Sequence, residues 1–233
     1  MKNNKVFYGL IPAKNKSARL KNKNLLKISN KTLLEIAVDC SKKCSFIKET
    51  YVSTNSNKIH EICKKIDVRV VKRLKKYTSN EAPVSFVIID FIKQLKLKNT
   101  KNTYIVLLQT TSPTRNLQHL KQAFKKLKSS KKNFLVSVKK NDNNILKSYY
   151  LKNSKYLPVY NSNASTTNQQ DLPKVISPNG AIYIFSVKDF LKKNRIPTKE
   201  FIPFMMKEEE SIDIDLREDY LKAKKILEKS NLR

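Results

Sequence analysis

Several residue types are scarce in this chain, and each scarcity excludes a class of protein. The 233 residues include two glycines, three cysteines, two histidines and no tryptophan. Cys40, Cys44 and Cys63 form no C-x-x-C pair, so neither a disulfide framework nor a zinc site is indicated, and a reducing compartment is expected. The first apolar run, 6–11, is too short for a signal peptide, and no run approaches the roughly 20 residues that span a bilayer. The sequence therefore predicts a cytoplasmic protein without a membrane segment.

Acidic residues are also scarce. There are 19 of them against 49 basic residues, which gives a formal net charge of +30. The excess is nearly all lysine, with 42 lysines and seven arginines, and it is spread through almost every segment instead of forming one basic arm. This distribution is typical of solvated faces, so a dedicated nucleic-acid function is not expected. The surface field should nevertheless favour anionic ligands such as nucleotides and sugar acids.

The apolar pattern alternates short strands with amphipathic helices. Strands are expected over 5–11, 49–53, 68–72, 103–109, 134–139 and 181–185, and helices over 32–44, 57–66, 83–97, 117–127 and 216–228. Thr32 followed by Glu35 has the spacing of a capping box at the start of the first helix. The alternation predicts one α/β domain over 1–233, in which a mixed, mainly parallel, Rossmann-like sheet carries helices on both faces in three layers.

The strand and helix pattern breaks down between 141 and 177, where tyrosines, polar runs and two prolines occur. A structureless loop of this length is uncommon in a compact domain. Packing in an interface is a better explanation than stacking on bases for its tyrosines, Tyr149, Tyr150, Tyr156 and Tyr160. We therefore expect an excursion that packs on a partner subunit.

Three polar segments follow expected strands, which is where ligands bind in open parallel sheets. The first, 11–24, carries four lysines and one arginine that could neutralise a triphosphate, although a solvated lysine-rich turn is an alternative. The second, 107–115, presents an amide, four hydroxyls and a guanidinium, or is simply a strand, a turn and a helix cap. The third, 211–215, places Asp213 and Asp215 on one face of an extended chain. Such a pair is typical of Mg²⁺ sites, and a pair of carboxylates at a helix start is the alternative.

Together these segments resemble the acylneuraminate cytidylyltransferases, the CMP-sialic acid synthetase family. The family's first loop commonly reads I-P-A-R-G-G-S-K-R-I-P-G-K-N, which 11–24 matches without a gap. Its Q-P-T-S-P-L-R resembles 109–115, its N-G-A-I-Y-I matches 179–184 and its D-I-D matches 213–215. The resemblance covers nearly the whole chain. It implies a nucleotide-diphospho-sugar transferase-like fold and transfer of CMP from CTP to a sialic-type nonulosonic acid with Mg²⁺ as cofactor. It also implies a homodimer with the 141–177 excursion at the interface.

The resemblance assigns roles to positions in this sequence. The catalytic residues would be Lys14, Lys23 and Asp215. The nucleotide would be bound by Ala13, Lys14, Asn15, Ser17, Arg19, Lys23, Asn24, Arg73 and Ala82. The sugar would be bound by Gln109, Ser112, Arg115, Lys147, Gln170 and Tyr183, and the metal by Asp213 and Asp215. His60 and His119 receive no role, because neither has a nearby partner for a catalytic triad.

The sequence departs from the family's pattern at some of these positions. Asn15 and Lys16 replace the glycine pair, and Lys14 keeps the charge of the usual arginine without its bidentate fork. Asn168 and Gln169 stand where related proteins often carry arginines. Activation of a different acid (legionaminic, pseudaminic or Kdo) and a weakened homologue that only binds nucleotide are therefore alternatives to a sialic acid enzyme.

Overall fold

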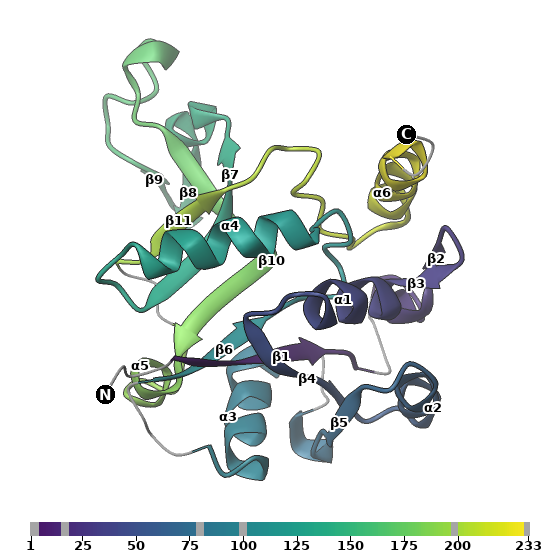
Figure 1. Cartoon of the computed structure of the whole chain (residues 1–233). Coiled ribbons are helices and arrows are strands. Elements are labelled where there is room, and N and C mark those ends of the chain that lie inside the picture. The colour runs from purple at the N-terminus through teal and green to yellow at the C-terminus, as the bar shows by residue number, and fades with distance from the viewer. Residues whose placement is uncertain (1–4, 15–18, 78–81, 98–101, 197–199, 231–233) are drawn as a thin grey trace.

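The computed structural model describes residues 5–14, 19–77, 82–97, 102–196 and 200–230. Its centre is a seven-stranded sheet in the order β11-β7-β10-β6-β1-β4-β5 (Figure 1). The strands are β1 (Val6–Pro12), β4 (Ile47–Thr54), β5 (Arg69–Lys72), β6 (Thr103–Leu107), β7 (Phe134–Asn141), β10 (Val175–Ser186) and β11 (Ile202–Met205). β10 runs antiparallel to β6 and β7, and the other neighbouring pairs are parallel. The predicted mixed, mainly parallel sheet is confirmed.

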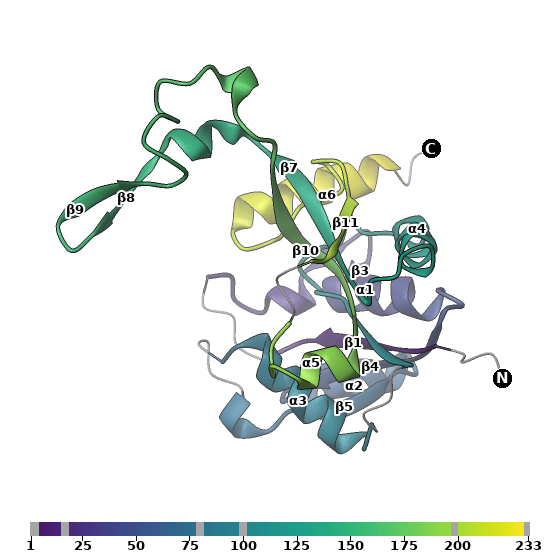
Figure 2. The same ribbon diagram turned by 90° about the vertical axis from the view of Figure 1, so that its left-hand side faces the viewer.

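Helices cover both faces of this sheet (Figures 1 and 2). The described α-helices are α1 (Leu33–Lys42), α2 (Asn57–Lys65), α3 (Val84–Gln94), α4 (Leu117–Lys128), α5 (Val187–Leu191) and α6 (Arg217–Ser230), the last of which lies to one side of the sheet. In β6, Tyr104 and Val106 are buried with α1, α2 and α4, whereas Ile105 and Leu107 are buried with α3 and α5. Successive side chains of a strand point to opposite faces, so a strand that is apolar throughout belongs in the middle of three layers.

Local sequence signals fix where the helices begin. The hydroxyl of Thr32 accepts a hydrogen bond from the Glu35 backbone N–H (3.1 Å), and the Glu35 carboxylate accepts one from the Thr32 N–H (2.7 Å). This is the predicted capping box of α1. Pro83 immediately precedes α3, where its missing N–H leaves no helical hydrogen bond unmade. The segment 212–214 packs on α6 through Ile212, Ile214 and Ala223, beside the start of α1.

Four elements of the sheet and its surroundings were not predicted from the sequence. They are the edge strand β11, the short helix α5 and two short strands, β2 (Lys27–Ile28) and β3 (Lys31–Thr32), that form a small hairpin. β11 contains Pro203, which ordinarily argues against a strand. A proline is tolerated at the edge of a sheet, because its missing N–H can face away from the only neighbouring strand. Elements this short carry too few residues to show a period.

The 141–177 excursion rises from the ends of β7 and β10 and stands away from the rest of the chain (Figure 2). It contains a hairpin of β8 (Tyr149–Lys152) and β9 (Lys155–Pro158), together with the single turns η3 (Asn143–Lys147) and η4 (Gln169–Asp171). The Asn143 side chain donates to the Gln169 carbonyl (2.8 Å) and so joins the two turns. The excursion is therefore structured, as expected from its length.

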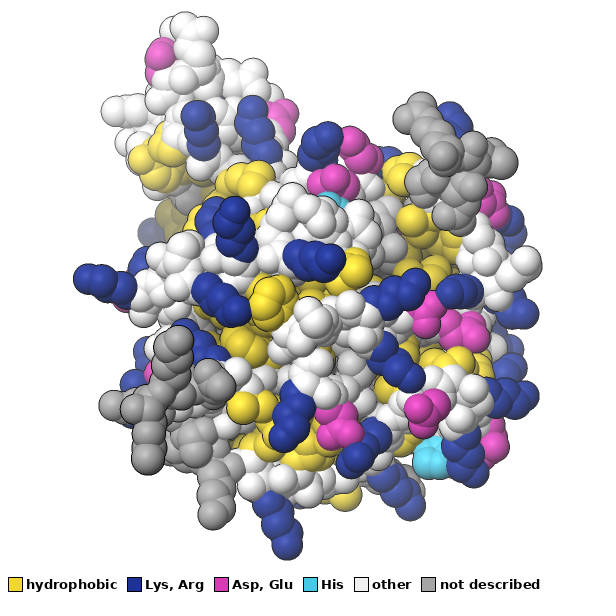
Figure 3. Space-filling view, in the orientation of Figure 1, with side chains coloured by type: hydrophobic (Ala, Val, Ile, Leu, Met, Phe, Trp, Pro, Cys, Tyr) yellow, Lys and Arg dark blue, Asp and Glu magenta, His cyan; other side chains and the backbone are white. Residues whose placement is uncertain are grey.

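The surface agrees with the lysine distribution read from the sequence. On the face seen in Figure 3, Lys and Arg side chains are scattered, with acidic and apolar side chains between them. They form no continuous basic stripe on that face. Within the ranges that the structure describes, no helix is long and apolar enough to cross a membrane.

Candidate active site

The candidate site lies where the central parallel strands end. β1, β4 and β6 run in the same direction, so their carboxyl ends meet at one edge of the sheet. The Ala13 N–H donates to the Ser53 carbonyl (2.9 Å), and the Leu108 N–H donates to the Leu10 carbonyl (3.0 Å). These bonds extend the pairing beyond the strands and hold the two predicted motif loops side by side.

A cavity of about 210 Å³ opens between these loops. Its lining includes predicted site residues from four separate stretches of the chain. It is formed by Pro12, Lys14, Lys23, Asn24, Arg73, Tyr77, Ala82, Val84, Val87, Gln109, Thr110 and Thr111. We call this the strand-end pocket. The structure thus brings together Lys14, Lys23, Asn24, Arg73 and Ala82, which the sequence assigned to the nucleotide, with Gln109, which it assigned to the sugar.

Three cations make the strand-end pocket electropositive. Arg73 is buried and donates to the carbonyl (2.9 Å) and the hydroxyl (3.3 Å) of Ser53. Burial lowers the pKa of Arg73 to about 10, against the opposing charge of Asp90. Burial also lowers the pKa of Lys14, and the positive charges of Arg73 and Lys23 lower it further. An anion placed among these groups would relieve their mutual repulsion.

The acidic segment meets the cationic loop directly. Lys23 Nζ lies 2.9 Å from Asp215 Oδ1, and Arg19 lies 3.2 Å from Asp215 Oδ2. The Ile214 N–H donates to the Thr111 carbonyl (2.8 Å), which ties the acidic segment to the end of β6 as well. The 11–24, 107–115 and 211–215 motifs therefore meet at one edge of the sheet. The first and the last of them are about 190 residues apart in sequence.

Asp213 lies beside the same edge. Partial removal from water raises the pKa of its carboxyl, a hydrogen bond from Thr111 opposes this rise, and the negative charge of Asp215 adds to it. Two mutually repelling carboxylates supply the oxygen ligands that a hard divalent cation prefers. Both oxygens of Asp215 are held by cations, so coordination there would require one ion pair to open. In the described part of the chain, no cluster of three or more Asp, Glu, His or Cys side chains is placed so that it could hold a metal ion.

Gly180 lies directly beside three side chains that were predicted to bind the sugar or the metal. Its φ is +77°, which side chains other than hydrogen rarely permit. A Cβ built there would lie 3.2 Å from Gln109 Oε1, 3.4 Å from Ser112 Oγ and 3.6 Å from Asp213 Oδ2. Gly180 was not predicted to have a role beyond its place in a motif, although it is one of only two glycines in the chain.

Arg115 and Ser112 support the pocket from behind instead of lining it. Arg115 is 2% exposed, and one guanidinium nitrogen donates to the carbonyls of Gln109 (3.0 Å) and Ala181 (2.9 Å). Ser112 is fully buried next to it. Arg115 thus fixes the end of β6 against β10, which places Gln109 and the strand residue Tyr183. Burial raises the pKa of Tyr183, and the charge of Asp213 raises it further, so this phenol lies within electrostatic reach of the acidic segment.

Asn179 is a linking residue that sequence analysis did not single out. Its Oδ1 accepts from the Ser137 hydroxyl (2.6 Å), and its Nδ2 donates to the Ser211 hydroxyl (2.9 Å). The buried side chain therefore connects β7, β10 and the start of the acidic segment. The sequence signal that could have identified it is its position directly before one of only two glycines in the chain.

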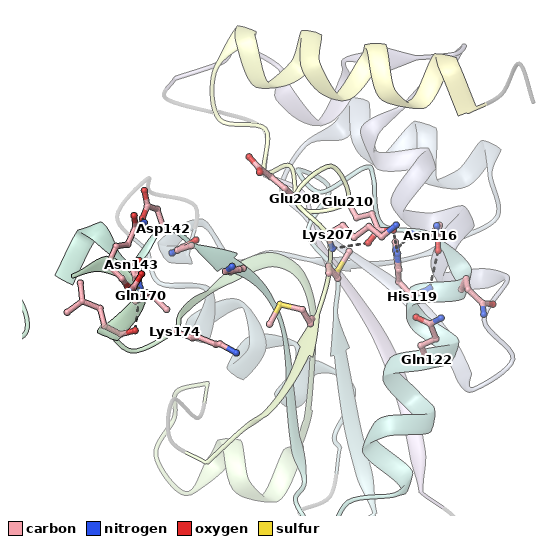
Figure 4. A pocket seen from close by; sticks show the side chains of 18 residues that line it. Asn116, His119, Gln122, Asp142, Asn143, Gln170, Lys174, Lys207, Glu208 and Glu210 are labelled. Atoms are coloured by element: carbon pink, nitrogen blue, oxygen red, sulfur yellow. Dashed lines mark hydrogen bonds and ion pairs between the residues drawn. The ribbon is translucent and has the colours of Figure 1, made fainter. Parts of the chain in front are cut away.

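Lys147 and Gln170, the remaining sugar candidates, lie in the excursion and do not line the strand-end pocket. Gln170 lines a larger cavity of about 1270 Å³, in which Asp142, Asn143, Gln170 and Lys174 face a wall that carries His119 and Glu210 (Figure 4). His119 Nε2 lies 3.3 Å from Glu210 Oε1, and its Nδ1 accepts from the Asn116 N–H (3.2 Å). The contact with Asn116 is part of the capping box of α4, so His119, to which the sequence assigned no chemistry, helps to begin this helix. Asn15 and Ser17 lie outside the described residues.

A profile of the protein family described as Cytidylyltransferase matches residues 8–230. The chain belongs to this cytidylyltransferase family. The match spans all three converging motifs as well as the strands of the sheet.

The sequence identity between this chain and individual cytidylyltransferases is low. The chain is 28% identical to an N-acylneuraminate cytidylyltransferase of Streptococcus agalactiae serotype V, over 91% of this chain and 51% of that protein. It therefore spans about half the length of that relative. It is 25% identical to a pseudaminic acid cytidylyltransferase of Campylobacter jejuni, over 95% of this chain and 96% of that protein. A solved CMP:2-keto-3-deoxy-manno-octonic acid synthetase complexed with CTP superposes over 97% of this chain and 99% of its own, with a TM-score of 0.68 and 12% identity, which shows a shared fold.

Proposed function

We propose that this chain transfers CMP from CTP to the anomeric hydroxyl of a sialic-type nonulosonic acid and releases pyrophosphate. The observation that carries the proposal is the ion pair between Lys23 and Asp215 at the mouth of an electropositive strand-end pocket. It joins a cationic loop suited to phosphates to a carboxylate pair suited to Mg²⁺. The names of the relatives, which include N-acylneuraminate and pseudaminic acid cytidylyltransferases, support this class of acid.

In this proposal the nucleotide lies in the strand-end pocket. Its phosphates meet Lys14, Lys23 and Arg19, and its base lies near Arg73 and Ala82, which line the inner wall. The attacking hydroxyl comes from the side of Gln109 and Tyr183. Positioning and charge neutralisation do most of the catalytic work in transfers of this kind, and no covalent enzyme intermediate is needed.

Asp213 and Asp215 are the residues that would hold Mg²⁺. When bound, the cation would neutralise charge on the phosphate oxygens as pyrophosphate leaves. The ammonium of Lys23, released from Asp215 by the incoming phosphates, would then bind those phosphates instead. In this proposal, the ion pair between Lys23 and Asp215 is exchanged for one between Lys23 and the phosphates.

One assay tests the proposed function. Pyrophosphate release is measured with each of the four nucleoside triphosphates across a panel of ulosonic acids, with and without Mg²⁺. We expect release only with CTP, Mg²⁺ and a nonulosonic acid. If Kdo were the one acid of the panel that is turned over, the substrate would be an eight-carbon acid instead of a nonulosonic acid. CTP binding without turnover of any acid, or salt-dependent DNA retention without CTP turnover, would contradict the proposal.

The lowered pKa of Lys14 makes a pH dependence measurable. Bound phosphates favour the ammonium form, so the pKa of Lys14 is higher in the complex than in the free protein. Below the free pKa both states are protonated and affinity is full, whereas at higher pH binding must take up a proton. CTP affinity measured by calorimetry should therefore stay level near neutrality and fall as the pH rises through the lowered pKa of Lys14, before the range in which an ordinary lysine titrates. Lys14→Arg should flatten this fall, and an equally steep fall in that variant would exclude Lys14 as its source.

We further propose a homodimer that buries the excursion and operates in the cytoplasm. The hairpin exposes Tyr149, Tyr150, Leu151 and Tyr156, the last of them 75% exposed. An apolar patch of this kind is typical of a protein interface. A partner's excursion would also bring a copy of Lys147 and Gln170 near a pocket that they do not line within one chain. The three buried, free cysteines suit a reducing compartment.

Sedimentation velocity at micromolar concentration checks the dimer. The wild type should sediment as a dimer, and Tyr156→Glu should shift it largely to monomer, because a buried charge without a partner costs several kcal/mol. Leu221→Glu is the matched control, since Leu221 is an exposed apolar residue on α6, away from the hairpin. A wild type that sediments as a monomer would remove the dimer from the proposal.

A further inference from the structure

Asn24 is a buried amide that is held from both sides. Its Nδ2 donates to the Lys14 carbonyl (2.8 Å), and its Oδ1 accepts from the Thr110 hydroxyl (2.6 Å). Asn24 is 7% exposed and Thr110 is 2% exposed. The three residues come from the loop after β1, the turn η1 (Lys23–Leu25) and the segment after β6. A single chain of hydrogen bonds therefore crosses the floor of the strand-end pocket.

Chemistry fixes the direction of this chain of hydrogen bonds. A backbone carbonyl can only accept, so the amide nitrogen of Asn24 must face Lys14. The amide oxygen then faces Thr110, whose hydroxyl must be the donor. Removing that hydroxyl would leave a buried acceptor without a donor and would free the amide to turn.

The two ends of this connection lie next to the phosphate-binding cations. Asn24 directly follows Lys23, and the carbonyl that it holds belongs to Lys14. The Thr110 hydroxyl thus restrains the backbone beside both lysines, from a residue in the segment that follows the central strand β6. The other anchor of Lys23 is its ion pair with Asp215, which the phosphates would disrupt. The hydrogen bonds through Asn24 do not depend on that ion pair.

We propose that Thr110 is a positioning residue for the nucleotide phosphates, and that it acts through Asn24 without contacting the phosphates itself. The inference rests on the proposed function of the strand-end pocket. Thr110 is one of the two positions at which 109–115 departs from the related Q-P-T-S-P-L-R pattern, which has proline there. A proline carries no hydroxyl, so this donor to Asn24 is a property of the present chain.

The test separates nucleotide binding from acid binding. Thr110→Val keeps the shape of the side chain and removes the donor. We expect the KM for CTP and its calorimetric Kd to rise by about fivefold to tenfold, the range expected for one buried hydrogen bond. The KM for the acid and kcat should change by less than about twofold, because Gln109 is held by Thr111 and Arg115, and the segment of Asp213 is held by the hydrogen bond from the Ile214 N–H to Thr111. Thr110→Ser should restore CTP affinity, and Thr110→Ala should behave as Thr110→Val does.

Thr50→Val is the matched control. Thr50 is also a buried threonine, and its hydroxyl pairs with Ser41 (2.7 Å) on the α1 side of β4, away from the strand-end pocket. It should lower the urea midpoint and leave CTP affinity unchanged. Asn24→Ala completes the set: in its background Thr110→Val should add little, because the connection is already broken.

Three outcomes are distinguishable. If the wild-type protein binds no CTP, the proposed function fails before Thr110 is considered. If the wild type binds CTP and Thr110→Val binds it equally tightly, the positioning role is wrong while the function stands. If Thr110→Val weakens CTP but Thr110→Ser does so to the same extent, the effect comes from packing, and the hydrogen bond is not its cause.

Discussion

Asp215→Ala is expected to lower kcat by about 100-fold or more while leaving the protein folded. The variant removes one of the two proposed metal ligands and the group that pairs with Lys23 and Arg19. Its side chain is 39% exposed, so the loss of these ion pairs should change the free energy of unfolding by at most about 1 kcal/mol. Pyrophosphate release and urea unfolding measure the two effects separately.

Glu209→Ala is the control for this loss of charge. Glu209 is an exposed carboxylate four residues before Asp213, and it does not line the strand-end pocket. Its removal should leave turnover within about twofold, as is usual for surface substitutions. Near-normal pyrophosphate release by Asp215→Ala, or an equal loss in Glu209→Ala, would refute the role given to Asp215.

Lys23→Met should lower kcat/KM for CTP by about 100-fold. The side chain of Lys23 is only 15% exposed, and its ammonium lies in a pocket whose other cations are Lys14 and Arg73. Charges in such a partly buried place act on a phosphate much more strongly than exposed ones do. Lys23→Arg keeps the charge and should lose considerably less. Steady-state kinetics with CTP as the varied substrate measures the effect.

Lys21→Met is the matched control for Lys23. Lys21 lies in the same loop, is exposed and carries the same charge, but it does not line the strand-end pocket. If both variants lost activity equally, the effect would come from the overall charge of the loop. The double variant Lys23→Met with Asp215→Ala should lose less than the product of the two single losses, because the two side chains contact each other.

Much of the fold was predictable because local rules dominate it. The alternating strands and helices, the capping box of Thr32 and Glu35 and the start of α3 after Pro83 follow from periodicity and backbone chemistry. The meeting of the 11–24, 107–115 and 211–215 motifs was also predictable in outline. Parallel strands deliver their loops to one edge, and phosphates and carboxylate-bound cations attract each other.

Contacts that depend on exact spacing were not predictable. No sequence rule states that Asn24 meets both Lys14 and Thr110, or that Asn179 joins Ser137 to Ser211. These contacts depend on the register of the sheet and on how far each loop bends, and both are set by packing across the whole domain. The edge strand β11 was missed for a related reason, because its pairing with β7 outweighs the local preference of Pro203.

Gly180 has a consequence for how the site can vary. The amide of Gln109, just beyond the end of β6, lies against a position of β10 that carries only a hydrogen atom. A methyl group at this position would lie 3.2 Å from the amide oxygen, closer than an ordinary contact, whereas it would meet the Asp213 carboxylate at an ordinary 3.6 Å. The close fit of the proposed sugar-binding amide therefore depends on the absence of a side chain, because a replacement would strain the backbone at a φ of +77° and would displace the amide by a few tenths of an ångström.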